Sequence, residues 1–164
     1  RLEHELLLRP SSGNRYCVAE LRTESIKHIY LVRSRLEGLV AFLATPQMMP
    51  KDVQRAESLL AAANEALKRG EIQKCADVGR QFHQLLMHKV DNEFLTDSLQ
   101  RLSVHVERGR RLAAQSDLTS AHSVEQHQQV LAAIKIGDAK LAEERMKDHI
   151  MSFIDEIQRS EFGA

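Results

Sequence analysis

Hydrophobic residues recur every three to four positions along most of this chain, which is the period of an amphipathic helix. The pattern predicts helices over residues 23–44, 51–69 and 72–90, a fourth after Asp91-Asn92, a fifth over 123–136 and a sixth after Asp138. A break is expected over residues 116–120. Because the connections between these long segments are short, the sequence predicts an all-α fold, an antiparallel bundle of about six helices.

The inward face of the first helix can be read from the same spacing. Its candidate core positions are Ile29, Val32, Leu36, Leu39, Val40 and Leu43. Pro46 and Pro50 separate this helix from the second, and Gly70 and Gly137 mark the ends of the second and fifth.

Strand-like alternation is confined to the first residues. Residues 6–10 and 15–18 read as two strands, joined by residues 11–14. Gly13 and Asn14 tolerate the positive φ of a tight turn, so a short β-hairpin is expected to precede the bundle. An isolated hairpin is marginal in water and needs a partner.

Composition narrows the class of protein. The 164 residues include 23 basic and 23 acidic side chains and only 4% aromatic residues. We do not expect tight DNA binding by this chain alone, because a nucleic-acid binder usually carries a basic excess. No apolar run approaches the roughly 20 residues of a membrane span. Cys17 and Cys75 lie far apart, so reduced thiols and a cytoplasmic location are expected.

Three of the eight histidines fall on apolar helix faces. His83 lies in the stripe of the third predicted helix, His127 in that of the fifth and His149 in that of the sixth. Imidazoles that face one another in a bundle core are a common way to hold a metal ion. Neutral imidazole suits Zn, Ni, Cu or Fe, so the spacing does not specify the metal. The alternative interpretation is that each is a hydrogen-bonded core histidine.

Two arginines are candidates for binding an effector. Arg33 lies at the edge of the inward face of the first helix, where its guanidinium could hold a ligand carboxylate. It also lies four residues before Glu37, so an ordinary i,i+4 ion pair on a solvated face is the alternative. Arg110 continues the apolar stripe of the fourth helix and is a weaker candidate for the same role.

Several segments together resemble a known family. They are residues 33–37 (RSRLE), 82–86 (FHQLL), 91–95 (DNEFL), 127–134 (HQQVLAAI) and 137–138 (GD), followed by Ala142 and His149. In this order they resemble the FadR C-terminal domain (FCD) type of GntR transcription regulator. Residues 1–5 resemble the end of a recognition helix, and residues 6–18 resemble the wing of a winged helix.

The resemblance implies a sensor of small molecules and not an enzyme. It divides the chain into residues 1–21, the end of a winged helix-turn-helix DNA-binding domain, and residues 22–164, the ligand-binding domain. It implies a homodimer that binds operator DNA through the N-terminal domain, with Arg9, Gly13 and Arg15 in the remnant of the wing. The implied effector is a small carboxylate in the bundle cavity, contacted by the three histidines with Arg33 and Arg110.

The resemblance also implies a divalent transition metal, Zn or Ni, on three histidines and one aspartate. His83, His127 and His149 match the three histidines. The aspartate should lie four residues before the first histidine, where this chain has Gly79. Asp77 lies about 200° around the helix from Gly79 and cannot simply replace that ligand. Gln126 also stands where the family often has glutamate.

Three other functions remain open at this point. One is a metal-dependent enzyme in a helical bundle, although no Glu-x-x-His pair and no obvious inward carboxylate are present. Another is an interaction module whose histidines are core residues. The third is a regulator that works without a metal.

Overall fold

The computed structural model describes residues 8–11, 15–20, 22–112 and 117–162, with all their side chains except those of residues 23, 110–112, 117–119 and 156–162. A short hairpin comes first, formed by β1 (Leu8–Ser11) and β2 (Arg15–Val18). The strands are antiparallel, with Arg9 opposite Cys17 and Pro10 opposite Tyr16. The predicted turn at Gly13 and Asn14 lies outside the described residues.

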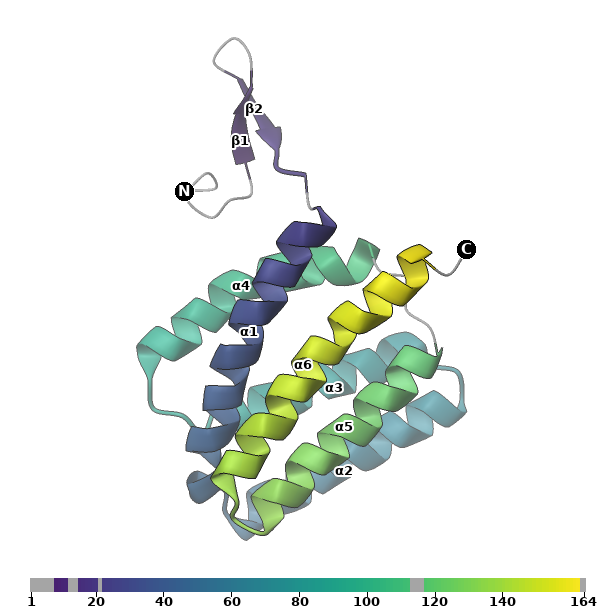
Figure 1. The fold of residues 1–164 in the computed structure, drawn as a ribbon. Coiled ribbons are helices and arrows are strands. Elements are labelled where there is room, and N and C mark those ends of the chain that lie inside the picture. Colours follow the sequence, from purple (N-terminus) through teal and green to yellow (C-terminus); the bar gives the residue numbers. More distant parts are fainter. Residues whose placement is uncertain (1–7, 12–14, 21, 113–116, 163–164) are drawn as a thin grey trace.

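Six long helices follow the hairpin, so the predicted all-α bundle is confirmed. They are α1 (Thr23–Ala44), α2 (Pro50–Lys68), α3 (Ile72–Met87), α4 (Glu93–Leu112), α5 (Asp117–Lys135) and α6 (Ala139–Phe162), with a 3-10 turn, η1 (Thr45–Gln47), after α1. Helix α6 lies between α1 and α5, α2 lies against α3 and α5, and α4 flanks α1 (Figure 1). None of the described helices is both long and apolar enough to cross a membrane.

Residues at the helix ends explain where the helices begin and end. Gly70 and Gly137 adopt φ of 70° and 74° after α2 and α5, a conformation that glycine reaches without the strain a Cβ adds. The side chains of Asn92 and Asp138 accept hydrogen bonds from backbone N–H groups in the first turns of α4 and α6. These capping residues were visible in the sequence.

The inward face of α1 is the predicted one in part, because Ile29, Leu36 and Leu43 are partly buried and pack against the core as expected. Val40 is buried, but Val32 and Leu39 are 50% and 39% exposed. The buried face also carries Ile26, Tyr30, Arg33, Glu37, Val40, Ala41 and Ala44. The polar pair Arg33 and Glu37 lies on this buried face, and its carboxylate contacts His83 of α3.

Two predicted boundaries were wrong. Helix α3 ends at Met87 and not at residue 90, because residues 88–90 form a turn in which Lys89 pairs with Asp52 at 2.6 Å. Helix α5 begins at Asp117, so residues 117–120 of the predicted break are helical. Ser and Thr in that stretch disfavour a helix only weakly, and the rest of α5 extends through them.

Candidate metal and effector site

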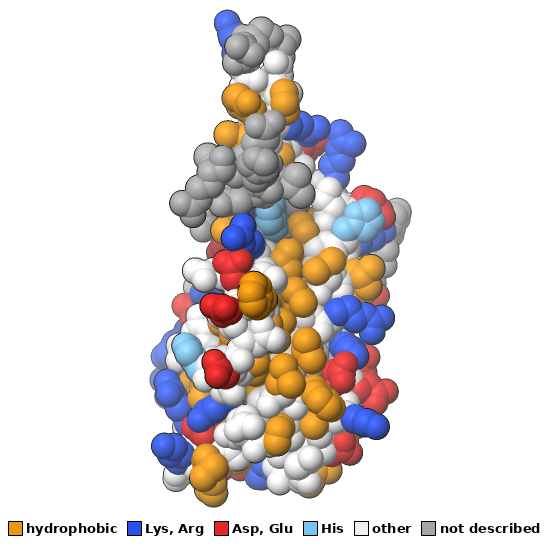
Figure 2. Space-filling view, turned by 90° about the vertical axis from the view of Figure 1, so that its left-hand side faces the viewer, with side chains coloured by type: hydrophobic (Ala, Val, Ile, Leu, Met, Phe, Trp, Pro, Cys, Tyr) orange, Lys and Arg blue, Asp and Glu red, His pale blue; other side chains and the backbone are white. Residues whose placement is uncertain are grey.

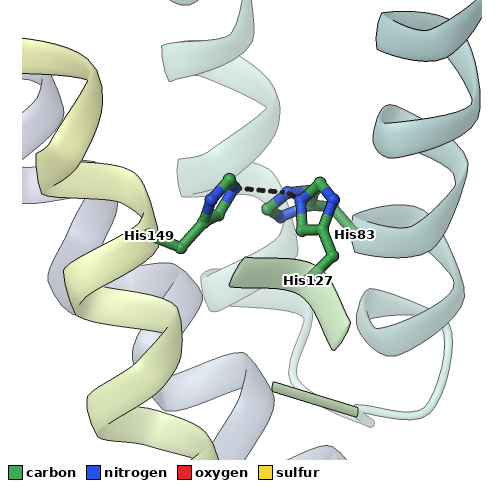
Figure 3. Close-up of side chains that lie close together, drawn as sticks. All are labelled: His83, His127 and His149. Atoms are coloured by element: carbon green, nitrogen blue, oxygen red, sulfur yellow. Dashed lines mark hydrogen bonds between the residues drawn. The ribbon is translucent and has the colours of Figure 1, made fainter. Parts of the chain in front are cut away.

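The structure brings His83, His127 and His149 together from α3, α5 and α6. Figure 3 shows the three imidazoles pointing toward one another. The Nε2 atom of His83 lies 2.8 Å from Nε2 of His127 and 3.3 Å from Nε2 of His149. One nitrogen of each ring lies within 4.8 Å of the others. We call these residues the histidine cluster.

A glycine on α3 lets α5 bring its imidazole this close. Gly79 lies one turn before His83, and a Cβ at this position would come within 3.2 Å of Cε1 of His127. Phe82 also packs against the His127 ring, with ring centroids 5.1 Å apart. The family resemblance implies an aspartate at this position. Here the His127 ring packs against the backbone of Gly79 and takes up part of the space that a side chain would need.

Two neighbouring side chains orient the outer rings of the cluster. The carboxylate of Glu37 accepts a hydrogen bond from Nδ1 of His83. The amide oxygen of Gln126 accepts one from Nδ1 of His149 at 3.0 Å and another from the Ser152 hydroxyl at 3.1 Å. Because the Nδ1 atoms of His83 and His149 are hydrogen-bonded from outside the cluster, the Nε2 atoms of these two rings are directed into it. This is the arrangement in which a second layer of residues fixes the orientation of metal-binding imidazoles.

The polar pair on α1 is buried beside the cluster. Arg33 and Glu37 are only 7% and 9% exposed, and Nε of Arg33 donates to Oε1 of Glu37 at 2.5 Å. Burial alone would raise the pKa of the Glu37 carboxyl, but the charges of Arg33 and His83 hold it well below its ordinary value. Glu37 therefore brings a negative charge to His83 from behind.

The imidazole of His149 is in the form that metals bind. Burial, followed by the neighbouring His127, His83 and Arg33, lowers the pKa of His149 well below its ordinary value. A neutral imidazole keeps the Nε2 lone pair that a metal ion needs.

The cluster geometry fits a divalent metal. With Zn–N distances of about 2.0–2.1 Å and tetrahedral angles, two ligand nitrogens lie roughly 3.3 Å apart. The pair His83–His149 already has this separation, and the pair His83–His127 would have to open by about 0.5 Å. The three ligand atoms lie within 4.8 Å of one another, so the rings must rotate to bring all three pairs to the tetrahedral spacing. Among the described residues, the group that could hold a metal contains three histidines and no carboxylate.

A small cavity adjoins the histidine cluster. Its volume is about 90 Å³, and its lining includes all three histidines, Arg33 and Arg80. Ser120, Ser123, Gln126 and Ser152 add polar groups, and Tyr30, Phe153 and Ile150 add apolar ones. The residues that line it include two arginines and no aspartate or glutamate. We call this space the histidine cavity.

The sequence had singled out some of these residues and missed others. Arg33 does form the i,i+4 ion pair with Glu37, but the pair is buried and not solvated. Glu37 is the inward carboxylate that was not recognised in the sequence, although it shares a helix face with Arg33 and Val40. The side chain of Arg110 lies outside those described. Asp77 pairs with Arg80 and does not reach the cluster.

Comparison with known proteins places this site in a family. A family model described as the FCD domain matches residues 28–152, which is most of the chain. The chain belongs to the FCD domain family. This confirms the resemblance seen in the sequence, and the solved structures with this fold include GntR regulators.

The relatives of this FCD domain are regulators of transcription. The chain is 23% identical over 146 residues to the "Probable D-xylose utilization operon transcriptional repressor" of Paenarthrobacter nicotinovorans. This match covers 89% of the chain and 64% of the relative. The chain is 22% identical over 155 residues to the transcriptional repressor RspR of Escherichia coli, covering 93% of the chain and 66% of the relative. The chain thus spans about two thirds of the length of these relatives, which are regulators and not enzymes.

Solved structures confirm the fold. The structure of E. coli McbR/YncC superposes with a TM-score of 0.82 at 20% identity, covering 98% of this chain and 76% of that one. A GntR protein from Streptococcus agalactiae superposes with a TM-score of 0.64, also at 20% identity, covering 94% of this chain and 77% of that one.

Proposed function

We propose that this FCD domain is the effector-sensing part of a DNA-binding transcription regulator. It binds a small organic acid at the histidine cluster, with a divalent metal such as Zn or Ni as part of the site. The observation that carries the proposal is the convergence of three Nε2 atoms on a cavity that contains two arginines and no acidic residue. Such a cavity favours an anion.

The roles of the residues follow from their positions. His83, His127 and His149 would hold the metal, and Glu37 and Gln126 orient the first and last of these rings. The metal would supply a Lewis-acidic centre for carboxylate oxygens. Arg33, fixed by Glu37 and lying 5.4 Å over the Tyr30 ring, presents its remaining N–H donors at the edge of the same cavity.

Helix α1 offers a route from the site to the DNA-binding part. It carries Arg33 and Glu37, and it follows the hairpin after a short link. Arg108 of α4 donates to the carbonyl of Ala19 in this link at 2.5 Å. We propose that residues 1–21 are the end of a winged-helix domain, in which Arg9 and Arg15 contact DNA. An acid that binds two arrangements of α1 unequally would then shift DNA affinity.

The exposed apolar side of α1 supports a homodimer as the working form. Leu31, Val32 and Leu39 of α1 and Val104 of α4 are 39–50% exposed. Figure 2 shows hydrophobic side chains gathered along the side of the molecule on which α1 and α4 lie. A second copy covering this side would bury it and would pair two DNA-binding parts, as a two-fold operator requires.

The metal is tested on protein purified without a metal-chelating tag. Elemental analysis of the wild type and of the His127→Ala variant is expected to give near-stoichiometric Zn or Ni in the first and little in the second. His28→Ala, an exposed histidine of α1, is the control that should keep the metal.

The acid is tested by titrating small carboxylates into the metal-loaded and metal-free proteins. Binding that requires both the metal and Arg33 supports the proposed site. Unchanged acid binding in a double variant, His83→Ala with His127→Ala, would overturn it. Metal-free protein that still binds acids would identify a regulator without a metal, and protein that binds neither would identify an interaction module.

A further inference from the structure

A second, larger space lies on the other side of Arg33. It has a volume of about 600 Å³ and is bounded by α1, α3 and α4, and we call it the α4 groove. Arg33, Arg80 and His83 line both the α4 groove and the histidine cavity. The two spaces therefore meet at two guanidinium groups and one imidazole.

The two spaces suit different parts of a ligand. A space of 90 Å³ holds an ion and a group about the size of a carboxylate, whereas pockets for small organic ligands measure roughly 300–1,000 Å³. Of these two spaces, the α4 groove reaches this size. An effector larger than a few atoms therefore needs the groove for most of its volume.

Part of the lining of the α4 groove is apolar. It is formed by Val40 of α1, Met87 of α3, and Leu99, Leu102 and Val106 of α4. Leu99 and Met87 are only partly buried against the core, so a ligand can remove more of their surface from water. Polar side chains of α4, among them Thr96, Gln100 and Ser103, complete the lining.

Charge distinguishes the end shared with the cavity from the rest of the groove. The acidic groups of the groove lining are Glu37, which is already paired with Arg33 and His83, and Glu107. Arg80 pairs with Asp77, which lines neither space. A single anionic group is therefore best accommodated at the shared end, because the rest of the groove lining contains no lysine or arginine to pair with a second one.

We propose that the histidine cavity and the α4 groove form one binding site for an amphipathic monoanion. Its carboxylate lies between Arg80, Arg33 and the histidine cluster, and its apolar body extends along α4 toward Leu99 and Val106. This inference rests on the proposed function, which places the acid at the cluster, and it adds the class of acid: one carboxylate on an apolar body, and not a small di- or triacid.

Three carboxylates that differ only in the body serve as probes. Acetate has the carboxylate alone, 4-phenylbutanoate adds an apolar body, and glutarate replaces that body by a second carboxylate. Titration calorimetry on the metal-loaded protein is expected to show 4-phenylbutanoate binding at least tenfold more tightly than either of the others. Glutarate binding as tightly as 4-phenylbutanoate, or more so, would overturn the inference and would leave a small polyacid at the cluster.

Two substitutions on α4 locate the body of the probe. Ser103→Trp places an indole in the groove from an exposed rim position, and it should reduce the affinity for 4-phenylbutanoate to that for acetate. Ser98→Trp, at an exposed position of α4 outside the groove lining, is the matched control and should bind like the wild type. Equal binding by wild type and both variants would show that the groove is not used.

Metal content separates this inference from the proposed function. If the wild type holds metal and acetate but gains nothing from the phenylbutyl body, the α4 groove is excluded and the cluster assignment stands. If the protein holds no metal but binds 4-phenylbutanoate in a way that Ser103→Trp abolishes, the groove stands and the metal is excluded. Arg80→Gln should weaken both acetate and 4-phenylbutanoate, because it removes charge at the shared end.

Discussion

The two sides of α1 each carry residues that the usual distribution of polarity would place on the other side. Its inner side holds Arg33 and Glu37 at 7% and 9% exposure, and its outer side holds Leu31 and Val32 at 48% and 50%. Burying an ion pair is costly unless its hydrogen bonds are satisfied, and exposing an apolar stripe is unfavourable unless something covers it. On the inner side Glu37 contacts the histidine cluster, and the outer stripe is the surface on which we propose the homodimer.

The strongest test of the inner side is Glu37→Ala. It leaves Arg33 and His83 without the carboxylate between them, and breaking a buried pair in this way costs about 3–5 kcal/mol. We expect a loss of this size in the free energy of unfolding, measured by urea denaturation of metal-free protein. Glu65→Ala removes an exposed partner of Lys68 and should cost no more than about 1 kcal/mol. A similar small cost for both would mean that burial of the inner pair has no energetic consequence.

The outer side is tested by the double variant Val32→Asp with Leu39→Asp. A two-fold interface contains each substitution twice, so we expect the dimer dissociation constant to rise about a hundredfold or more. The fold itself should survive, because both side chains are exposed in the single chain. Analytical ultracentrifugation measures the constant, and circular dichroism checks the fold. Ile136→Asp is the control, because Ile136 is an exposed apolar residue just after α5. A dimer that survives the α1 double variant but dissociates in Ile136→Asp would place the interface elsewhere.

Gly79→Asp tests whether the histidine cluster has a vacant ligand position that a carboxylate on α3 can fill. A carboxylate one turn before His83 could join the three imidazoles, and we expect zinc affinity to rise by about tenfold. The added Cβ requires the His127 ring to move by a few tenths of an ångström. Gly79→Ala isolates that steric effect and the helix propensity gained. Competition with a chromophoric chelator measures both, and equal affinities in the Asp and Ala variants would count against a vacant ligand position.

The smallest expected effect is a dependence of stability on pH. The folded chain holds the pKa of His149 well below its ordinary value, so between roughly pH 6.5 and that lower value the unfolded chain binds more protons. The free energy of unfolding of metal-free protein should therefore decrease as the pH falls below about 6.5. His149→Gln should flatten this decrease, and His28→Gln, on the exposed side of α1, should leave it in place. The measurement is thermal denaturation of the metal-free protein at pH 7.5, 6.5 and 5.5. A wild-type melting temperature that does not change over these three pH values would contradict the prediction.

Most of the fold could be predicted from the chain because its signals are local. The period of apolar residues predicted six helices, and residues such as Gly70, Asn92, Gly137 and Asp138 set several of their ends. The three histidines could be selected because each lies within the apolar stripe of a different helix. The start of α5 was missed because Ser and Thr are weak helix formers whose neighbours decided the outcome.

The sequence by itself therefore determined the helices, the histidines that face the core and the family. Only the tertiary structure decided that Arg33 and Glu37 are buried on α1 while Val32 and Leu39 are exposed. It also decided that Glu37 contacts His83, that Gly79 lies against the His127 ring, and that a groove opens beside α4. The physical reason is that helical periodicity tells which residues share a face, whereas the neighbours of the helix decide which face is buried. Those neighbours come from distant parts of the chain. The hydrogen bond between Glu37 and His83 keeps the polar pair of α1 buried, while Val32 and Leu39 stay exposed.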